Sequence, residues 1–454
     1  MAAAPPLPST VEQRLANGLR VIAARSGPSG LATASLMLRG GSSADPARAA
    51  GLTEKVGSIA LFGAPASAHR DKAAAYENLG LDAGVTVDAV STTLSLSGVS
   101  ASLEKGLALL AGHVIRPVVS PAGLRHLRVQ RQDGDDELDT LADDGVRALT
   151  RTVLEPTAAG AAERQTPQAA LRRYRQLFRP ENALLVVTGD IEPSAVFTMA
   201  AQSFGRWAAA SIPASIPAAA PAPAQPQGSS DADRQILIDL PGSPMAEIAI
   251  GAPIVSWLDP ARPSFDLANS ALGGSYAARL NQQVRAQHGL SYDVNSAIRD
   301  SDGESVLSVR TKVEPEAAAA VVQMIMGELS AFAAEGPTEA ELERHKRLVL
   351  GDIAHRAQTA DDLADLILDW AVAGATLEDL NGYSRRLAAA SRGEVRAAAA
   401  RLAPEKLSVV VVGDAARLAA LRRLFPNLSM VTAATMNEGE PGTGQGRRAL
   451  DARR

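Results

Sequence analysis

The feature that most constrains the fold of this sequence is a segment that occurs twice, once near the middle of the chain and once near its end. RPENALLVVTGDIEP occupies residues 179–193, and APEKLSVVVVGDAAR occupies residues 403–417. In both copies a Pro-Glu pair precedes a run of Leu and Val typical of a buried strand, and Gly-Asp follows at the same spacing. A match in pattern, spacing and position within each half indicates an internal duplication. The sequence therefore predicts two homologous halves.

A segment rich in Pro, Ala, Gly and Ser separates the two halves. It reads SIPASIPAAAPAPAQPQGSSDADR from Ser211 to Arg234 and shows no apolar periodicity. A structureless run of this length is unusual inside a compact domain, so it is predicted to be a linker. The segment from Asn437 onward has turn residues and charge without an apolar face, which predicts disorder. The expected organisation is an N-terminal domain at residues 1–210, a linker at 211–234, a C-terminal domain at 235–436 and a disordered tail at 437–454.

Each half is predicted to combine strands and helices in one unit. Runs with strand character are NGLRVIAAR, TASLMLRGG and VSTTLSLSGV in the first half, and ILIDL, AEIAIGAP and SVLSVRTKV in the second. Helices are expected from about Gly51, Arg70, Ser102 and Pro121, and through SYAARLNQQVRAQ. A long helix is expected from PTEAELER, where Pro337 and the Glu residues after it fit a helix start. The expected fold class is α+β, with two homologous α/β-roll halves, each a mainly antiparallel sheet flanked by helices.

Composition argues against several classes of protein and site. The chain of 454 residues has no cysteine, so disulfides and thiolate metal sites are excluded. Its net charge of −5 argues against nucleic acid as a partner, because phosphate binding needs a basic surface. No run of about eighteen apolar residues occurs, which predicts no membrane span. The start MAAAPPLPSTVEQ lacks a basic leader and an apolar core, so a cytoplasmic protein and an exported mature protein both stay open.

The histidines do not form a zinc-binding pair on a helix. No two of them are three or four residues apart; they are His69, His113, His126, His288, His345 and His355. No metal site is therefore expected in this chain. His345 and His355 lie on or after a charged helix and are expected to be solvated. Ser58 lacks the G-x-S-x-G context of a hydrolase nucleophile, and Gly273-Gly274 lack the G-K-[ST] of a phosphate loop.

The segment with the most chemical information is NSALGGSYAARLNQQVRAQHGLSYDVNSAI, residues 269–298. Its Gly-Gly start is predicted to open an amphipathic helix that ends at Arg285. A turn at His288-Gly289 then leads into a strand, so Arg285 and Tyr292 can face one another across a helix-to-strand corner. The residues alone allow two interpretations. Either Arg285 caps carbonyl groups while Tyr292 packs with its hydroxyl at the surface, or the pair has a functional role.

This segment resembles the C-terminal half of the M16 (pitrilysin-like) metallopeptidases, whose signature runs L-G-G, then S-R-L, then R-x-x-x-G-L-x-Y. The chain supplies Leu272-Gly273-Gly274, Ala278-Arg279-Leu280, Arg285, Gly289-Leu290 and Tyr292. The NGLRVI opening, the PTEAELERHKRLVLG helix and both PE…VVxGD strands also resemble the family. The resemblance covers nearly the whole chain, from about residue 12 to residue 430.

The resemblance also aligns AGLTEKVGSIALF, residues 50–62, with the helix on which active members carry H-x-x-E-H. In those members the two His bind zinc and the Glu activates water. Here Glu54 and Ser58 stand at the His positions and Gly57 stands at the position of the base, so all three are changed. Near the place of the family's third ligand the chain offers only the acidic run Asp135 to Glu137, which by itself is typical of a solvated helix face. Because a zinc site draws on several ligands together, the resemblance implies no catalytic zinc in this chain.

The whole pattern resembles the non-metal-binding subunit of the heterodimeric M16B peptidases, which keeps the Arg/Tyr pair. It implies a partner subunit with an intact H-x-x-E-H motif that carries the zinc, the two chains enclosing a chamber for peptide substrates. Tyr292 would donate its hydroxyl to the carbonyl oxygen as it becomes an oxyanion, and Arg285 would hold a nearby substrate carbonyl. Many bacterial relatives are periplasmic, so the periplasm is the expected compartment and the cytoplasm the alternative. A non-catalytic peptide-binding chamber and a structural M16-like scaffold subunit are the alternative functions.

Overall fold

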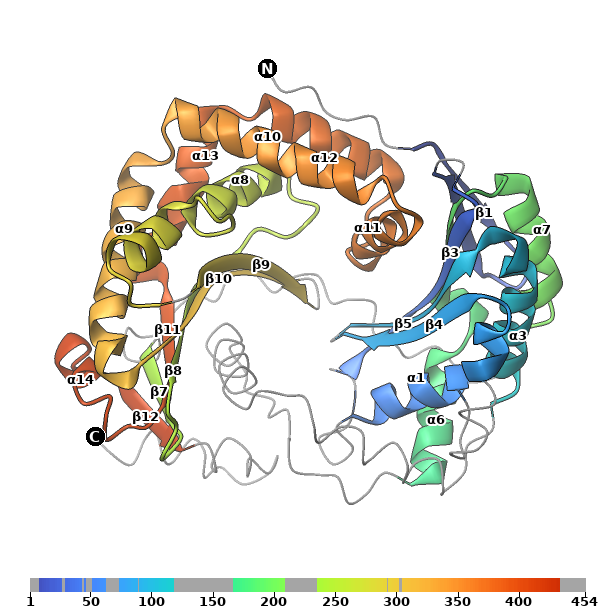
Figure 1. Ribbon diagram of the computed structural model, residues 1–454, viewed down its shortest axis with the longest axis horizontal. Coiled ribbons are helices and arrows are strands. Elements are labelled where there is room, and N and C mark those ends of the chain that lie inside the picture. Colours follow the sequence, from blue (N-terminus) through green and yellow to red (C-terminus); the bar gives the residue numbers. More distant parts are fainter. Residues whose placement is uncertain are drawn as a thin grey trace.

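The chain folds into two halves, each built on one six-stranded sheet (Figure 1). The computed structural model describes residues 8–26, 29–42, 45, 51–62, 73–88, 90–117, 166–208, 235–291, 293–301 and 304–432. The predicted linker at 211–234 and the predicted tail at 437–454 lie outside these residues. All strands of the first sheet precede residue 190, and all strands of the second follow residue 234. The predicted α+β architecture is confirmed.

The two sheets share the order of five strands, which supports the duplication seen in the sequence. The first sheet runs β1-β2-β6-β3-β5-β4 and the second runs β12-β7-β11-β8-β10-β9. The strands of the first sheet are β1 (Thr10–Arg14), β2 (Arg20–Arg25), β3 (Leu31–Arg39), β4 (Leu81–Val87), β5 (Ser91–Val99) and β6 (Ala183–Gly189). Those of the second are β7 (Gln235–Asp239), β8 (Ala246–Ile254), β9 (Val294–Ser301), β10 (Glu304–Val313), β11 (Ser408–Gly413) and β12 (Ser429–Thr432). β2 pairs parallel with β6, as β7 does with β11, and the next three pairings in each sheet are antiparallel, so both sheets are mainly antiparallel as predicted.

The sixth strand differs between the two sheets. β1 pairs antiparallel with β2, whereas β12 pairs parallel with β7. The first sheet thus takes this edge strand from the chain before β2, and the second takes it from the chain after β11. Our sequence analysis did not predict β1, β4 or β12, and all three lie at sheet edges. Edge strands bury fewer side chains, so their sequences, such as TVEQR in β1, carry little apolar pattern.

Helices of the first half cover one face of its sheet. They are α1 (Leu52–Phe62), α3 (Leu103–Ile115), α6 (Pro167–Leu177) and α7 (Pro193–Phe204). Side chains alternate across the sheet, so Val21 and Ala23 of β2 join the core under these helices while Ile22 and Ala24 face the opposite side. Strand β6 is buried along its whole length because both faces of the sheet are covered.

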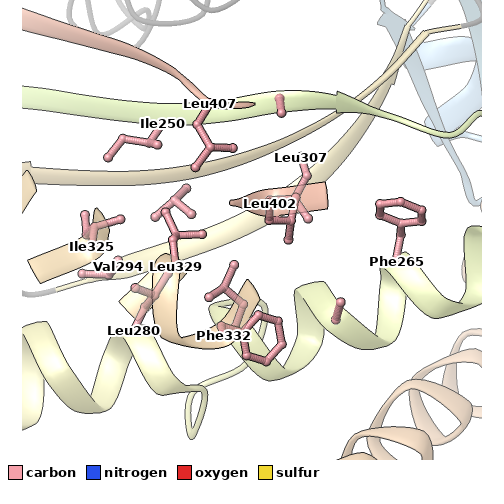
Figure 2. Packing of buried hydrophobic residues seen from close by; sticks show 14 of the residues in the cluster. Ile250, Phe265, Leu280, Val294, Leu307, Ile325, Leu329, Phe332, Leu402 and Leu407 are labelled. Carbon is pink, nitrogen blue, oxygen red and sulfur yellow. The ribbon is translucent and has the colours of Figure 1, made fainter. Parts of the chain in front are cut away.

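Helices of the second half enclose its core in the same way. They are α8 (Arg262–Leu272), η8 (Asn281–Gln287), α9 (Ala318–Glu335), α10 (Glu339–Arg356), α12 (Leu377–Ala389), α13 (Arg392–Ala399) and α14 (Leu421–Leu424). Figure 2 shows Ile250 and Leu307 of the sheet packed with Leu329 and Phe332 of α9. Capping boxes begin three of the helices, α10 at Thr338, α12 at Thr376 and α13 at Ser391, which explains why these helices start where they do. The predicted start of α10 is confirmed.

One helix of the second half packs against the first sheet. Helix α11 (Ala360–Val372) lies beside β3 (Figure 1), and its apolar side chains, including Ile367, join Ile22, Met37 and Val186 in one cluster. We call this contact the α11 interface. At its start Asp361 accepts hydrogen bonds from the hydroxyls of Thr33 and Ser97, the second at 2.9 Å. The second half therefore supplies a layer of the first half, which the prediction of two separately flanked sheets did not include.

In the described part of the chain, one helical segment is long and apolar enough to cross a membrane by length and composition. It runs from Pro315 to Glu335 and includes α9, with a mean hydropathy of 1.5. Val321, Ile325 and Phe332 on one side of this helix belong to the core of the second half. Packing against the second sheet accounts for only part of the apolar composition, because 33% of the apolar window is buried.

Candidate functional site

Helix α1 carries the three positions that align with a zinc motif. Glu54 and Ser58 lie one turn apart on the same side of the helix and are half-buried, and Gly57 is buried. A carboxylate beside a hydroxyl is not a zinc ligand set, since zinc sites combine His, Cys and carboxylate donors. No group of three or more His, Cys, Asp or Glu side chains that could hold a metal ion occurs within the described ranges. The acidic run Asp135–Glu137 lies outside them.

Gly57 is pressed against the first sheet. A Cβ atom at this position would lie 2.9 Å from Val85 Cγ2 and 3.4 Å from Thr92 Cγ2. The β-branched side chain of Val85 has little freedom to turn away. A glutamate could enter only if Val85 or α1 shifted, so packing obstructs the position that aligns with the catalytic base.

The start of α1 is fixed by a buried ion pair between Asp45 and Arg173. The Thr53 backbone N–H donates to Asp45 Oδ2 at 3.0 Å, and the Thr53 hydroxyl donates to the same carboxylate. Arg173 of α6 donates from Nε to Thr53 Oγ1 at 2.8 Å and from Nη2 to the Gly41 carbonyl at 2.9 Å. Burial lowers the pKa of Arg173, and the charge of Asp45 opposes that shift. Helix α1 is thus firmly anchored although its zinc-motif positions are changed.

The Gly-Gly pair after α8 serves close packing. A Cβ atom on Gly273 would lie 2.8 Å from Ser296 Oγ, and one on Gly274 would lie 2.8 Å from Asn269 Nδ2. The Ser296 backbone N–H donates to the Gly273 carbonyl at 3.2 Å, which joins the end of α8 to β9. Only glycine allows this approach of two backbones, so the pair has a structural role.

Arg279 joins the segment after α8 to α9 and α10. Its Nε and Nη2 donate to the two carboxylate oxygens of Glu341 at 2.9 and 2.8 Å, and Nη1 lies 3.5 Å from Glu328. Such two-pronged pairs are among the strongest in proteins. The hydrogen bonds from Arg279 lower the pKa of Glu341 to about 2. The arginine of the L-G-G…R-L pattern is therefore a structural residue here.

The helix predicted from residue 275 begins later than expected. Residues 273–278 form turns after α8, and the helix that carries Arg285, η8, has wide π-type turns. It ends at Gln287, two residues past the predicted end at Arg285. The Gly289 N–H donates to the Arg285 carbonyl at 3.0 Å, and the φ of Gly289, 62°, lies in the left-handed region. This geometry is an αL cap, which favours glycine at that position. The Gly-Leu of the signature is thus a helix stop.

Arg285 lies beside an aromatic ring that our sequence analysis did not single out. Its guanidinium carbon is 4.9 Å from the centroid of the Tyr276 ring, a cation–π distance. Arg285 is half-buried and Tyr276 is 79% exposed. Tyr292 lies outside the described residues, so the pairing of Arg285 with Tyr292 stays a prediction. The one sequence signal for Tyr276 is an aromatic residue directly after Gly-Gly-Ser.

His345 is buried, so the prediction that it is solvated is wrong. Its side chain lies under α8, with Nδ1 2.8 Å from the Ser270 hydroxyl. Burial and the charge of Arg344 lower its pKa to about 4. The surrounding helix is charged, but His345 itself is on the inward face. His355, by contrast, is exposed as predicted.

A second polar cluster in the second half was also not predicted. Arg262 donates from Nε to Asp266 at 3.0 Å and from Nη1 and Nη2 to Asp300 at 2.7 and 2.9 Å. The Tyr383 hydroxyl donates to Asp266 at 2.7 Å. The guanidinium carbon of Arg262 lies over the Trp257 ring, 4.3 Å from the ring centroid. Burial raises the pKa of Asp266, and the charge of Arg262 opposes that shift. The cluster ties α8 to β9 and α12, and the four-residue spacing of Arg262 and Asp266 is the signal that could have revealed it.

Two α+β halves whose sheets share five strands in the same order define a two-domain architecture. Residues 165–349 match the family model described as the Peptidase M16 inactive domain. An uncharacterised zinc protease of Streptomyces coelicolor is 24% identical over 275 residues, which cover 59% of this chain and 58% of that protein. An uncharacterised zinc protease of Mycobacterium leprae is 27% identical over 215 residues, which cover 46% of this chain and 42% of that protein. The chain therefore spans about half the length of these curated relatives.

Solved structures share the fold at lower identity. A protease from Helicobacter pylori superposes with a TM-score of 0.76 at 16% identity, covering 90% of this chain and all of that one. A peptidase M16 inactive domain from Pseudomonas fluorescens superposes with a TM-score of 0.76 at 19% identity, and the match covers 89% of this chain and 98% of that one. The periplasmic protease PqqL from Escherichia coli gives 0.67 at 17% identity, covering 91% of this chain but 47% of PqqL. These likenesses establish the two-domain fold.

Proposed function

We propose that this chain is the non-metal subunit of a heterodimeric zinc peptidase of the M16B type. Its partner would be a second M16 chain with an intact H-x-x-E-H motif, and its substrate would be a peptide held between the two chains. The zinc would belong to the partner, where it would supply activation of the attacking water. This chain would supply hydrogen-bond donors to carbonyl oxygens of the substrate.

The observation that carries the proposal is the contrast between α1 and the segment from Gly273 to Leu290. In α1 the position of the base is obstructed by packing of Gly57 on Val85. The second segment keeps the M16 signature; Arg279 ties it to α10, and Arg285 is partly exposed. A chain whose α1 lacks a zinc ligand set but which keeps the donor segment is suited to complete a site whose metal lies on another chain.

The length of PqqL supports a two-unit assembly. The superposition includes 91% of this chain but only 47% of PqqL, so PqqL has room for about two units of this size. In the proposed heterodimer the second unit is a separate polypeptide.

The two donors would act at different stages of the reaction. When water attacks the scissile carbonyl, the C=O π electrons move onto the oxygen, and the Tyr292 hydroxyl would donate to that developing charge. A donor to charge that is absent from the bound substrate acts on kcat. Arg285 would donate to a carbonyl that does not react, so it would bind the substrate and the transition state equally and act on KM.

Reconstitution with the zinc-bearing chain tests the proposal. We expect neither chain alone to cleave a quenched fluorescent peptide and the mixture to cleave it. Tyr292→Phe should lower kcat of the mixture by about 10²–10³-fold, and Arg285→Ala should raise KM. A matched control is Arg417→Ala, because Arg417 forms an exposed ion pair with Glu316 at the other end of the second half; it should change neither constant.

The proposal fails if the purified chain alone retains stoichiometric zinc through dialysis and hydrolyses peptides. It also fails if both variants support full activity in the mixture. Peptide binding with no cleavage in any mixture would instead identify the chain as a non-catalytic peptide-binding chamber. We place the assembly in the periplasm, which cell fractionation with an antibody against this chain would test.

A further inference from the structure

Tyr276 is unusual among the exposed apolar side chains of the described residues. Its ring is 79% exposed, whereas the other large apolar side chains with high exposure are aliphatic: Val11, Leu31, Val99, Leu258, Leu348 and Met430. A tyrosine offers a large contact area with few rotatable bonds, which is why it is common in binding sites. The ring also has a defined neighbour, the guanidinium of Arg285 at 4.9 Å.

Hydrogen bonds hold Ser275, the residue directly before Tyr276. The Ser275 hydroxyl donates to the Ser270 carbonyl at 3.1 Å, and Asn281 Nδ2 donates to the Ser275 carbonyl at 3.1 Å. Three residues further on, Arg279 is tied to α9 and α10 by its ion pairs. The loop is therefore anchored while the ring at its tip is exposed. A contact surface that is ordered before binding avoids part of the entropy cost of binding.

Arg285 reaches the ring from η8, and wide π-type turns like those of η8 are frequently found at functional sites. If the guanidinium holds a substrate carbonyl, the Tyr276 ring lies within one or two residues of that carbonyl along an extended peptide, which advances about 3.3 Å per residue. The charge of Arg285 disfavours a basic side chain next to the ring. An apolar or aromatic side chain gains contact area there without that cost.

We propose that Tyr276 is a specificity-determining residue: its ring contacts an apolar or aromatic side chain of the bound peptide, next to the carbonyl held by Arg285. This inference rests on the proposed function, because that function places a peptide carbonyl at Arg285. It adds a side-chain preference to the backbone contacts proposed for Arg285 and Tyr292. It also assigns a role to a residue outside the M16 signature.

Peptide selection by the isolated chain tests this inference without the zinc-bearing partner. The immobilised chain is incubated with a defined pool of synthetic peptides, and bound peptides are quantified by mass spectrometry. We expect peptides with Leu, Met or Phe at one position to be enriched about two- to tenfold more by the parent than by Tyr276→Ser, the effect of one aromatic contact. Tyr276→Phe should keep the preference. Leu348→Ser, which removes an exposed apolar side chain from α10, is the matched control and should also keep it.

A binding cycle then assigns the contact to one side chain. An enriched peptide and its Ser-substituted version are labelled with fluorescein, and anisotropy gives Kd for both with the parent and with Tyr276→Ser. The inference requires that the loss of the ring and the loss of the peptide side chain are not additive. Equal selection by the parent and Tyr276→Ser, additive losses, or no peptide binding at all would overturn it.

The two proposals fail separately. If no mixture of the two chains cleaves peptides while Tyr276 still selects apolar peptides, the heterodimeric peptidase is wrong and the ring contact stands. If the peptidase depends on Arg285 but selection ignores Tyr276, the ring contact is wrong and the heterodimer stands.

Discussion

Lowering the pH from 7 to 5 should destabilise the second half through one side chain, His345. The residue is 1% exposed and its pKa is lowered to about 4 from an ordinary 6.5, because burial and the charge of Arg344 disfavour the protonated ring. The unfolded chain takes up a proton below pH 6.5, whereas the folded chain does so only near pH 4. The stability linked to His345 is therefore complete above pH 6.5 and is lost as the pH falls toward 4.

The magnitude follows from the shift. One pKa unit corresponds to 1.36 kcal/mol, so a shift of about 2.5 units is worth about 3.4 kcal/mol, of which about 2 kcal/mol is lost between pH 7 and pH 5. Glu341, which lies close by, does not interfere in this range. Its pKa of about 2 means that its stabilising contribution is lost only below about pH 4.5.

Tryptophan fluorescence can isolate the second half in this experiment. The chain has three Trp residues, and Trp207→Phe leaves Trp257 and Trp370, both in the second half. Urea unfolding at pH 7 and pH 5 is compared between this background and the same chain with His345→Asn, whose amide can occupy the place of Nδ1 and does not titrate. The His-containing chain should lose about 2 kcal/mol more than the Asn variant over this range. Equal losses in the two chains would refute the assignment.

Three further predictions concern α1, Arg279 and the α11 interface. The triple variant Glu54→His/Gly57→Glu/Ser58→His should retain no stoichiometric zinc by mass spectrometry, and overpacking should lower its free energy of unfolding by about 1–3 kcal/mol. The double variant Glu54→His/Ser58→His keeps Gly57 and should keep the parental melting temperature. Zinc retention by the triple variant without destabilisation would contradict the packing argument. Arg279→Ala should lower the free energy of unfolding by about 1.5–3 kcal/mol, because the charged hydrogen bonds of Arg279 are lost. The control Arg417→Ala should leave the urea midpoint unchanged. Equal midpoints for the two variants would be evidence against a structural role of Arg279. Asp361→Ala should speed hydrogen exchange in residues 360–372, because the hydroxyls of Thr33 and Ser97 lose their acceptor. Asp352→Ala, at an exposed position, is the control and should leave this exchange unchanged. Unchanged exchange in Asp361→Ala would show that apolar packing alone holds α11.

The central strands and capped helices could be predicted because their signals are local. β6 and β11 are buried on both faces or nearly so, which requires continuous runs of Leu and Val that the sequence displays directly. The start of α10 was readable from Pro337 and Glu341, since a capping box is written in adjacent residues. Edge strands β1, β4 and β12 lack such runs because much of each strand is exposed.

The arrangement of the candidate site could be predicted only in part, because it depends on contacts between distant residues. The sequence marks Gly57 as a changed motif position, but the obstruction of that position by Val85 depends on how α1 lies on β4. Likewise, the amphipathic pattern ADDLADLILDWAV of α11 indicates a helix with one buried face, but not that this face meets the other half's sheet. Arg285 was recognised by family resemblance, and its neighbour Tyr276 became evident only from the turns after α8.

The source of the sixth strands has a consequence for cutting the chain. Because β1 comes from upstream of its sheet and β12 from downstream, no strand pairing joins the two sheets in the described residues. Polypeptides 1–210 and 235–454, produced separately, would each carry every strand of one sheet and could be recombined by complementation. Their reassociation would then report on the docking of α11 and the residues flanking it onto the face of the first sheet.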